Sequence, residues 1–411
     1  MSNMEGFLRS DGRKGIRNVV VVAYVVECAR HVATRIAEAL GDQVQVIGFS
    51  GCYPNEYAAH MLARLCTHPN VGATLIVSLG CEGFDRQALK EQIQASGRPA
   101  ETVVIQNIGG TRATIDAGRA WVQGAVKVIS EVPKVPMSLS DLVVGTICGG
   151  SDSTSGLSAN PAVGYVFDRL VTEGATAIFE ETGELIGCEY AMAERAVSAE
   201  LGHELVAAVD KANAYYTLLG HGSFAAGNAE GGLTTIEEKS LGAYSKSGGA
   251  PICGLLKPGD LPPAGGLYLL DVIPDGEVRW GFPNINDNAE IAEMMACGAH
   301  LILFTTGRGS VVGSAISPII KVCANPETYR RMAEDMDVDA GRVLEGRATL
   351  EQVGDEIFDQ TCRVAAGEAS ASEILGHQEF VLTYKSFVPA GPGCLPGVNL
   401  GHGSVSLAPT W

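Results

Sequence analysis

Short apolar runs alternate with amphipathic stretches along the first 150 residues of the chain. Residues 19–25 are apolar and mostly β-branched, a pattern typical of a strand that is buried on both faces of a parallel sheet. The predicted strands span residues 19–25, 44–48, 73–79, 102–106 and 142–147, and the predicted helices span residues 28–40, 56–66, 86–95 and 113–129. This alternation predicts an α/β protein with an N-terminal doubly wound parallel sheet of the Rossmann or flavodoxin-like kind.

The pattern is less regular beyond residue 150, where we expect a second α/β domain that carries the catalytic residues. Strands are predicted at residues 175–179, 301–305 and 319–323, one long helix within 187–218, and a Gly-rich loop at 220–232. Residues 131–140 contain two prolines and are the predicted linker. The predicted domains are therefore 1–135 and 136–388, followed by an extended Pro/Gly-rich tail at 389–411.

Composition narrows the class of protein. With 29 Lys+Arg against 47 Asp+Glu, the net charge of −18 argues against binding to a nucleic-acid backbone. The longest apolar run, residues 19–26, is far shorter than the roughly 20 residues that span a bilayer. The N-terminus shows no signal peptide, and the odd number of 11 cysteines does not suit a secreted disulfide framework. We expect a reduced, cytoplasmic protein without nucleic-acid or membrane partners.

Three cysteines lie where predicted strands end, each beside a glycine: Cys52, Cys81 and Cys148. Parallel sheets bind ligands outside the carboxyl ends of their strands, so thiols at this edge are candidate metal ligands. The alternative is that each cysteine is a small apolar residue that closes a buried strand. No CxxC pair is present, so the spacing does not indicate a zinc site or an iron–sulfur cluster.

The polar loop that follows Cys148 is the densest in the chain and leads into a predicted helix at Pro161. Its hydroxyl, amide and carboxylate groups can contact an oxygen-rich ligand, or they can serve only to cap the helix. The run of polar residues and glycine from 149 to 156 is longer than a cap requires, which favours a binding role. The candidate residues are Ser151, Asp152, Thr154 and Asn160.

Carboxylates cluster after the strand predicted at 175–179, at Glu180, Glu181 and Glu184. Acids brought together in this way need a cation or a proton to compensate their charge, unless they are simply solvated. Lys239 lies among acids after the Gly-rich loop, where it could transfer a proton or form an ion pair.

The segment TTGRGSVVGS at 305–314 is the basic loop of an acidic protein. Arg308, flanked by glycines, can approach a carboxylate with two parallel hydrogen bonds, and Thr306 lies in the same loop. Lys321 lies in an apolar stretch where a charge needs a reason. His221, in the Gly-rich loop, is the best functional candidate among the eight histidines.

Several of these segments together resemble the altronate/galactarate dehydratase family. They occur in the family's order and cover the chain up to about residue 380: DGRKGIRN (11–18), HPNVGATLIVSLGCE (68–82), CGGSDSTSGLSANPAVG (148–164), GGLTTIEEKSLG (231–242), FTTGRGSVVGS (304–314) and DMDVDAG (335–341). The resemblance implies a metal-dependent lyase, usually with Fe²⁺, that removes water from a sugar acid to give a 2-keto-3-deoxy acid. Carboxylate ligands alone would suit Mn²⁺ or Mg²⁺ equally.

The chain departs from the family pattern in three places. Members often carry a small β-rich domain ahead of the DGRxGxRN motif, so here we expect that part either to be absent or to be supplied in trans by a small SAF-like subunit. The segments SGCYPN (50–55) and GFPNINDN (281–288) differ from the usual dehydratase sequences, which leaves the sugar acid open. SDSTSGL and LGHQEFVLT (375–383) are also similar to the large subunit of sulfolactate sulfo-lyase, so release of sulfite is the alternative reaction.

The residue chemistry and the resemblance together define an expected site whose substrate is a sugar acid or another small hydroxy acid. We also expect the protein to be a homo-oligomer. The expected metal ligands are Cys52, Cys81, Cys148 and Glu184; the catalytic residues are Lys239, Asp152 and Glu181; the substrate ligands are Arg308, Lys321, Ser151, Thr154, Asn160 and Thr306. A rival hypothesis of another class is a non-catalytic subunit that binds a sugar acid. Acid/base residues such as Lys239 favour catalysis, since recognition alone does not need them.

Overall fold

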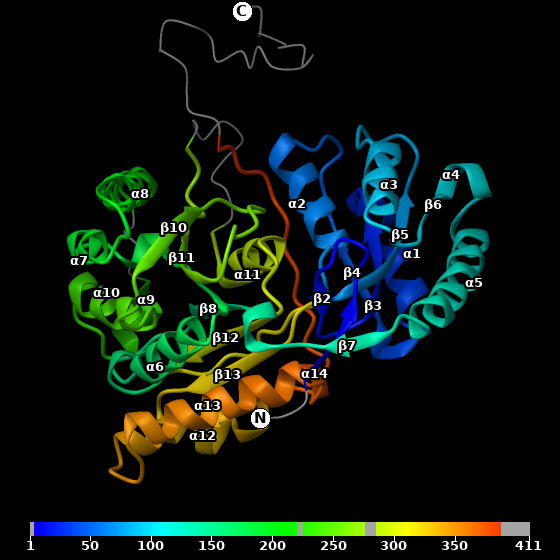
Figure 1. Cartoon of the computed structure of the whole chain (residues 1–411). Coiled ribbons are helices and arrows are strands. Elements are labelled where there is room, and N and C mark those ends of the chain that lie inside the picture. Colours follow the sequence, from blue (N-terminus) through cyan, green and yellow to red (C-terminus); the bar gives the residue numbers. More distant parts are fainter. Residues whose placement is uncertain (1–3, 221–224, 276–284, 388–411) are drawn as a thin grey trace, which may run out of the picture.

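The computed structural model describes residues 4–220, 225–275 and 285–387, and it confirms the α/β class (Figure 1). Two parallel sheets lie side by side, and a small antiparallel sheet lies between them at one end. In the described part of the chain, no helix is both long and apolar enough to cross a membrane.

The N-terminal sheet has the strand order β4-β3-β5-β6, all parallel, with helices on both faces. Alternate residues of the central strand enter two different cores, because successive strand side chains point to opposite faces. Val20 and Val22 pack with α1 and α5, whereas Val21 and Ala23 pack with α2 and α3. The strands are β3 (Val19–Tyr24), β4 (Val44–Gly48), β5 (Val71–Ser78) and β6 (Ala100–Val104), and the helices are α1 (Glu27–Ala37), α2 (Glu56–Cys66), α3 (Arg86–Ala95), α4 (Ile105–Ile108) and α5 (Thr111–Ser130). A closer likeness to Rossmann or flavodoxin folds stays a prediction.

Two predictions about residues 131–148 are wrong. The strand predicted at 142–147 is β8 (Val143–Cys148), and it belongs to the second sheet instead of being a fifth strand of the first. The predicted linker contains β7 (Lys134–Pro136), which pairs antiparallel with β1 (Glu5–Leu8), and β1 pairs in turn with β2 (Lys14–Gly15). A strand of three residues leaves too short a pattern to be recognised in the sequence.

The second sheet has seven parallel strands in the order β10-β11-β9-β8-β12-β13-β14. β8 lies between β9 and β12 in the sheet. After β8 the chain adds β9 on one side, and after β12 it adds β13 on the opposite side. The strand order therefore reverses between β8 and β12, the position where α/β sheets bind ligands. The other strands are β9 (Thr176–Phe179), β10 (Ile252–Leu256), β11 (Gly266–Leu270), β12 (Leu301–Thr306), β13 (Ile319–Cys323) and β14 (Val338–Asp339).

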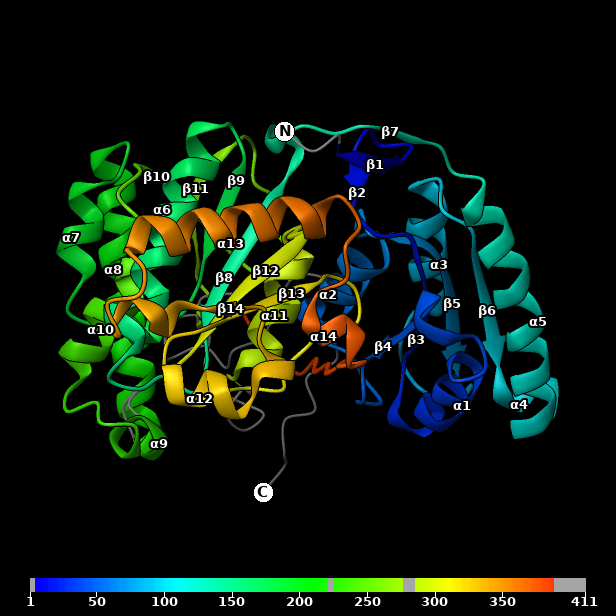
Figure 2. The ribbon, with the colours of Figure 1, turned by 90° about the horizontal axis from the view of Figure 1, so that it is seen from below.

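Helices cover both faces of this sheet. Seen from below, α13 (Leu350–Ala365) crosses it, and α6 (Ala159–Thr172) packs against α13 on the same face (Figure 2). On the opposite face α11 (Asp287–Ala296) packs between the sheet and α2 of the N-terminal part, so that one core joins both sheets. The remaining helices are α7 (Glu189–Glu194), α8 (Ala199–Leu219), α9 (Ala226–Glu230), α10 (Ile236–Ser245), α12 (Pro326–Arg331) and α14 (Ala371–Ile374).

The segment 187–218 contains the predicted long helix, α8, and a short helix, α7, precedes it. The Ser198 hydroxyl accepts a hydrogen bond from the Leu201 N–H (3.2 Å) and so starts α8 anew. Ala196, between the helices, forms a parallel bridge with Ile252 at the start of β10. The break therefore lets the chain touch the sheet edge, a tertiary contact that helical spacing cannot reveal.

Buried polar groups join the two parts of the molecule. His68 of the N-terminal part contacts the Ala299 carbonyl (3.2 Å), and the Asn70 amide donates to the His300 carbonyl (3.0 Å). Arg17 of the DGRKGIRN motif forms an ion pair with Glu373 near the end of the described chain (2.7 Å). This motif therefore connects distant segments, and the buried His68 ring has a structural role between the two parts.

Candidate active site

An acid-lined cavity lies at the carboxyl ends of β9 and β11, next to the reversal point of the second sheet. β8 ends at Cys148, and β9 is followed directly by Glu180 and Glu181. The cavity has a volume of about 100 Å³ and is lined mainly by carboxylates from the β9 loop and from α11. Its lining residues are Glu180, Glu181, Gly183, Glu184, Tyr216, Val272, Ile273, Ile285, Asn286, Asp287 and Glu290.

Glu181 has a strained backbone. Its φ of +87° is the single left-handed value among the described residues other than glycine. Such a conformation costs on the order of 1–3 kcal/mol and persists where the surroundings enforce it. Here its carboxylate accepts a hydrogen bond from the Cys148 N–H (2.9 Å), and its other oxygen lies against the Lys246 ammonium. This backbone conformation therefore places the Glu181 carboxylate at the end of the neighbouring strand β8, beside Cys148.

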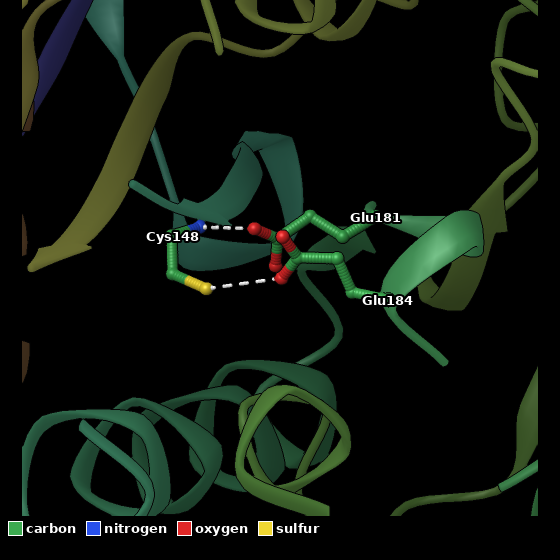
Figure 3. A group of neighbouring side chains, drawn as sticks. All are labelled: Cys148, Glu181 and Glu184. Atoms are coloured by element: carbon green, nitrogen blue, oxygen red, sulfur yellow. Dashed lines mark hydrogen bonds between the residues drawn. The ribbon is translucent and has the colours of Figure 1, made fainter. Parts of the chain in front are cut away.

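Cys148, Glu181 and Glu184 form a group that could hold a metal ion, with one ligand atom from each residue within 4.8 Å of the others (Figure 3). The Cys148 thiol lies 3.6 Å from the nearer Glu184 oxygen, and the Ser151 hydroxyl donates to the sulfur (3.2 Å). One thiolate and two carboxylates suit a borderline divalent cation such as Fe²⁺. The donor set therefore fits the metal that the family resemblance implies.

Burial acts on the same thiol. It raises the pKa of Cys148, and Glu184 adds to the rise, whereas the Lys246 and Lys239 ammonium groups oppose it. The thiol is therefore protonated near neutral pH unless a cation displaces the proton. Metal binding at this group would release a proton, since the thiolate is the ligand.

Two lysines, one on α10 and one directly after its last residue, neutralise the carboxylates of this group. Lys239 pairs with Glu184, and Lys246, seven residues later and two helical turns on, pairs with Glu181. Burial acts to lower the pKa of Lys239, but Glu184 and Cys148 outweigh it and raise that pKa. Lys239 is therefore a protonated ammonium. Lys246 is absent from the sequence prediction, although its spacing from Lys239 places both on one face of a helix.

Asp287 faces the same cavity from the first turn of α11. Burial, reinforced by Glu184, raises its pKa to about 6. A Cβ on Gly149 would overlap the Asp287 carboxylate, so glycine at the end of β8 allows this approach. Segment 281–288 differs from the usual dehydratase sequences, but the sequence prediction assigned Asp287 no role. The cap at Asn286, whose side chain accepts from the Ala289 N–H (3.1 Å), is the local signal that places Asp287 in a helical first turn.

Further acids lie behind the cavity. Glu180 and Glu290 are buried beside each other, and burial raises the pKa of each well above its usual range. Glu293, one turn beyond Glu290 on α11, pairs with Lys385 (2.7 Å) and accepts a hydrogen bond from the Tyr57 hydroxyl (2.5 Å). Sequence reasoning missed Glu290, Glu293 and Lys385, because their partners come from three distant segments.

The predicted polar residues after Cys148 are engaged within their own loops. The Asp152 carboxylate accepts from the Thr154 N–H (2.9 Å) and from the Asn325 amide (3.0 Å). The Asn160 side chain donates to the Gly242 carbonyl (3.0 Å) and so ties α6 to α10. Thr306 accepts from the N–H of Gly309 (3.0 Å). None of these side chains is among the described residues that line the cavity.

The two predicted carboxylate ligands lie in different surroundings. Arg308 is partly exposed and binds the Gly227 carbonyl (2.5 Å) and Glu230 (3.2 Å) of α9. Lys321 is fully buried, with its ammonium near the Val312 carbonyl and the His377 ring (both 3.3 Å), and burial lowers its pKa. The structure does not bring Lys321 together with the Cys148 group.

The other predicted metal ligands lie on the other sheet. Cys52 and Cys81 are exposed in loops at the carboxyl edge of the N-terminal sheet, and the Gly83 N–H donates to the Cys52 carbonyl (2.8 Å). They are outside the three-residue group that could hold a metal in the described chain. His221 and residues 281–284 lie outside the described residues, as does the predicted tail at 389–411.

Two family profiles and several curated proteins match this chain. The family profile "D-galactarate/Altronate dehydratase, C-terminal" matches residues 139–388, and the profile for the second domain of D-galactarate dehydratase and altronate hydrolase matches residues 6–130. The (2R)-sulfolactate sulfo-lyase subunit beta of Chromohalobacter salexigens is 34% identical over 92% of this chain and 96% of its own length. The altronate dehydratases of Bacillus subtilis and Escherichia coli are 29% and 28% identical, over 89% and 93% of this chain and 74% and 77% of theirs. The chain therefore belongs to the D-galactarate/altronate dehydratase family, a family of carbon–oxygen lyases.

Proposed function

We propose that the protein eliminates water from a sugar acid or a small 2-hydroxy acid and releases a 2-keto-3-deoxy acid. The observation that carries the proposal is the buried group of Cys148, Glu181 and Glu184 at the reversal point of the second sheet. Asp287, a carboxyl group whose pKa is raised to about 6, lines the cavity beside it, and the protonated Lys239 pairs with Glu184 of the group, so that the site offers the base and the acid that an elimination requires.

Cys148, Glu181 and Glu184 are the proposed metal ligands. A divalent metal bound there would stabilise the negative charge that develops on the substrate carboxylate when the neighbouring proton leaves. The thiolate favours Fe²⁺ over Mg²⁺, and Mn²⁺ is an alternative. Cys52 and Cys81 are left out of this ligand set because they lie on the other sheet.

Asp287 is the proposed base. Its carboxylate would accept the proton from the carbon next to the substrate carboxylate, and the electron pair of that C–H bond would form the C=C bond. Lys239 is the proposed acid: its Nζ would give a proton to the β-hydroxyl, which leaves as water when its C–O bond breaks. The enol that results tautomerises to the 2-keto acid. Glu184 keeps Lys239 charged for this step, since it raises the pKa of that lysine.

Arg308 is the proposed ligand of a substrate carboxylate. The backbone N–H of Arg308 donates to the Gly150 carbonyl (2.9 Å). The Arg308 loop is therefore next to the turn at Gly149, which approaches Asp287 closely. Two guanidinium nitrogens of Arg308 bind α9, and its side chain is partly exposed, which leaves donors for a ligand. Ser151, which contacts the Cys148 sulfur, is the proposed hydroxyl contact.

Release of sulfite is the second candidate reaction. The sulfo-lyase relative favours it, because the alignment covers 96% of that subunit. Sulfite is a far better leaving group than hydroxide and does not need a proton to depart, so Lys239 would matter less for it. The description of that relative as subunit beta also supports a partner, and we propose a small SAF-like subunit in trans and a homo-oligomer of this chain. The ten described cysteines are all free, which supports a reducing compartment such as the cytoplasm.

The test is an anaerobic assay of the purified protein with Fe²⁺, with and without the small subunit of a sulfo-lyase relative. A panel of aldonates, aldarates and (2R)-sulfolactate is followed for 2-keto acid and for sulfite. A 2-keto-3-deoxy product that is lost in Asp287→Asn supports water elimination. Sulfite without such a product, and with Lys239→Met still active, supports the second reaction. Binding without product under every condition would indicate the non-catalytic subunit instead.

A further inference from the structure

Lys385 is a fully buried cation in the last described segment of the chain. Its side chain and that of Glu293 have no exposed surface, and its Nζ lies 2.7 and 2.8 Å from the two Glu293 oxygens. The third donor of the ammonium is used by the Val272 carbonyl at 3.2 Å. Every hydrogen-bonding position of this lysine is therefore satisfied without water.

The contacts of Lys385 join three segments: the loop after β11, α11 and the start of α2. Val272 lines the cavity from the loop after β11. Glu293 lies on α11, where Asp287 and Glu290 line the cavity at intervals of three residues on the same helical face. The Lys385 carbonyl accepts from the Asn55 amide at the start of α2 (2.5 Å), so the N-terminal part holds the segment in place.

Burying the Lys385–Glu293 ion pair costs free energy, so its presence needs an explanation. A buried ion pair is often no more stabilising than apolar residues of the same size, because both charges lose their hydration. Lys385 also lies near enough to Glu290 to oppose the rise that neighbouring carboxylates add to the pKa of Glu290. A lysine that only filled space would be replaceable by a methionine; this one compensates the acids of the cavity wall.

We propose that Lys385 is a positioning residue of the active site: by holding Glu293, it keeps α11 in the rotation and depth at which Asp287 faces the Cys148 group. Lys385 does not touch substrate in this proposal. It rests on the proposed elimination, because Asp287 is the group whose placement it controls. The last described segment of the chain thus completes a site formed by residues far from it in the sequence.

The experiment compares Lys385→Met, Glu293→Gln and the double variant with the full-length protein and with a matched control, Arg17→Met. Arg17 also joins a distant segment to the C-terminal region by an ion pair, with Glu373, but away from the cavity. We measure kcat, KM, thermal stability, and amide hydrogen–deuterium exchange of α11, with α13 as the internal reference.

We expect Lys385→Met to lower kcat at least tenfold with KM changed less than threefold, and to speed exchange in α11 but not in α13. The double variant should regain stability but not kcat, and Arg17→Met should lose stability with kcat unchanged. Recovery of kcat in the double variant, equal loss of kcat in Arg17→Met, or unchanged exchange in α11 would each overturn the inference. If the wild type turns over no substrate, the proposed function fails, and the exchange data alone still decide whether Lys385 positions α11.

Discussion

The Lys246 ammonium lies against the Glu181 carboxylate, and the two side chains are 1% and 3% exposed. Glu181 reaches this position with a left-handed φ of +87°. A buried pair and a strained backbone in the same place, at the end of a central strand, mark the residue pair around which the candidate site is arranged.

Removing Lys246 should destabilise the protein strongly. We expect Lys246→Met to lower the free energy of unfolding by about 3–5 kcal/mol, because it leaves the Glu181 charge buried and unpaired. The double variant Lys246→Met/Glu181→Gln should recover much of that loss. Urea denaturation measures the effect, with Lys90→Met as the matched control: its partner Glu101 is half exposed, so the loss should be at most about 1 kcal/mol. Equal losses in the two lysine variants would contradict the prediction.

Metal binding should depend on Cys148 and Glu184. We expect Cys148→Ser and Glu184→Gln to weaken Co²⁺ or Fe²⁺ binding at least tenfold, and Cys148→Ser to abolish the thiolate-to-cobalt absorption band. Cys253→Ser is the control, since Cys253 is exposed on β10 and outside the group. Unchanged cobalt spectra in Cys148→Ser would remove this thiol from the ligand set.

The rate of elimination should fall as the solution becomes more acidic, because the proposed base becomes protonated. With the pKa of Asp287 raised to about 6, its carboxylate is ionised above that pH and protonated below it. A base must be ionised, so kcat should decline as the pH falls through about 6. Asp287→Asn should lower kcat on the order of 100-fold and remove this limb of the profile. A profile that keeps the limb in Asp287→Asn would assign it to another group.

Glycine at position 149 should be required for activity. A Cβ there would overlap the Asp287 carboxylate and the Phe304 ring, so Gly149→Ala should displace Asp287 and lower kcat at least tenfold. Gly124→Ala is the matched control: it lies in α5 with no atom within 4 Å of the added carbon, and alanine there should stabilise the helix by up to about 1 kcal/mol. Steady-state kinetics and thermal unfolding of both variants test the pair. Full activity of Gly149→Ala would show that Asp287 need not occupy its present position.

Acid should destabilise the junction between the two parts of the molecule. Burial lowers the pKa of His300 from 6.5 to about 4, and its ring accepts the Val143 N–H (3.0 Å) while facing the Lys14 carbonyl (2.8 Å). Between these pH values the unfolded chain binds a proton that the folded chain does not. Stability should therefore fall as the pH drops from 6.5 through about 4, by on the order of 3 kcal/mol from this residue.

Denaturation curves between pH 4 and 7 measure that slope. His300→Asn should flatten it, and His203→Asn, a change at an exposed histidine on α8, should leave it unchanged. His68 acts in the same direction, since burial lowers its pKa well below the usual range, so part of the slope should remain in His300→Asn. An unchanged slope in His300→Asn would contradict the prediction.

Strand and helix positions followed closely from local pattern. β4, α2, α3 and β13 begin and end at the predicted residues, because a buried parallel strand is a continuous apolar run and an amphipathic helix has its own spacing. The assignment of β8 to the wrong sheet shows the limit of that reasoning. A strand looks the same whichever sheet it enters, and only pairing with β9 and β12 decides.

For the site, local pattern was enough to predict which side chains lie at strand ends: Cys148 ends β8, and Glu181 and Glu184 follow β9, where parallel sheets bind ligands. The residues that face them depend on how distant elements pack. Lys246 and Asp287 come from helices far along the chain, and Cys52 lies at the equivalent edge of the other sheet. Chemistry along the chain is local, but the charges that tune a buried carboxylate or thiol act through space, so they appear only when distant elements pack together.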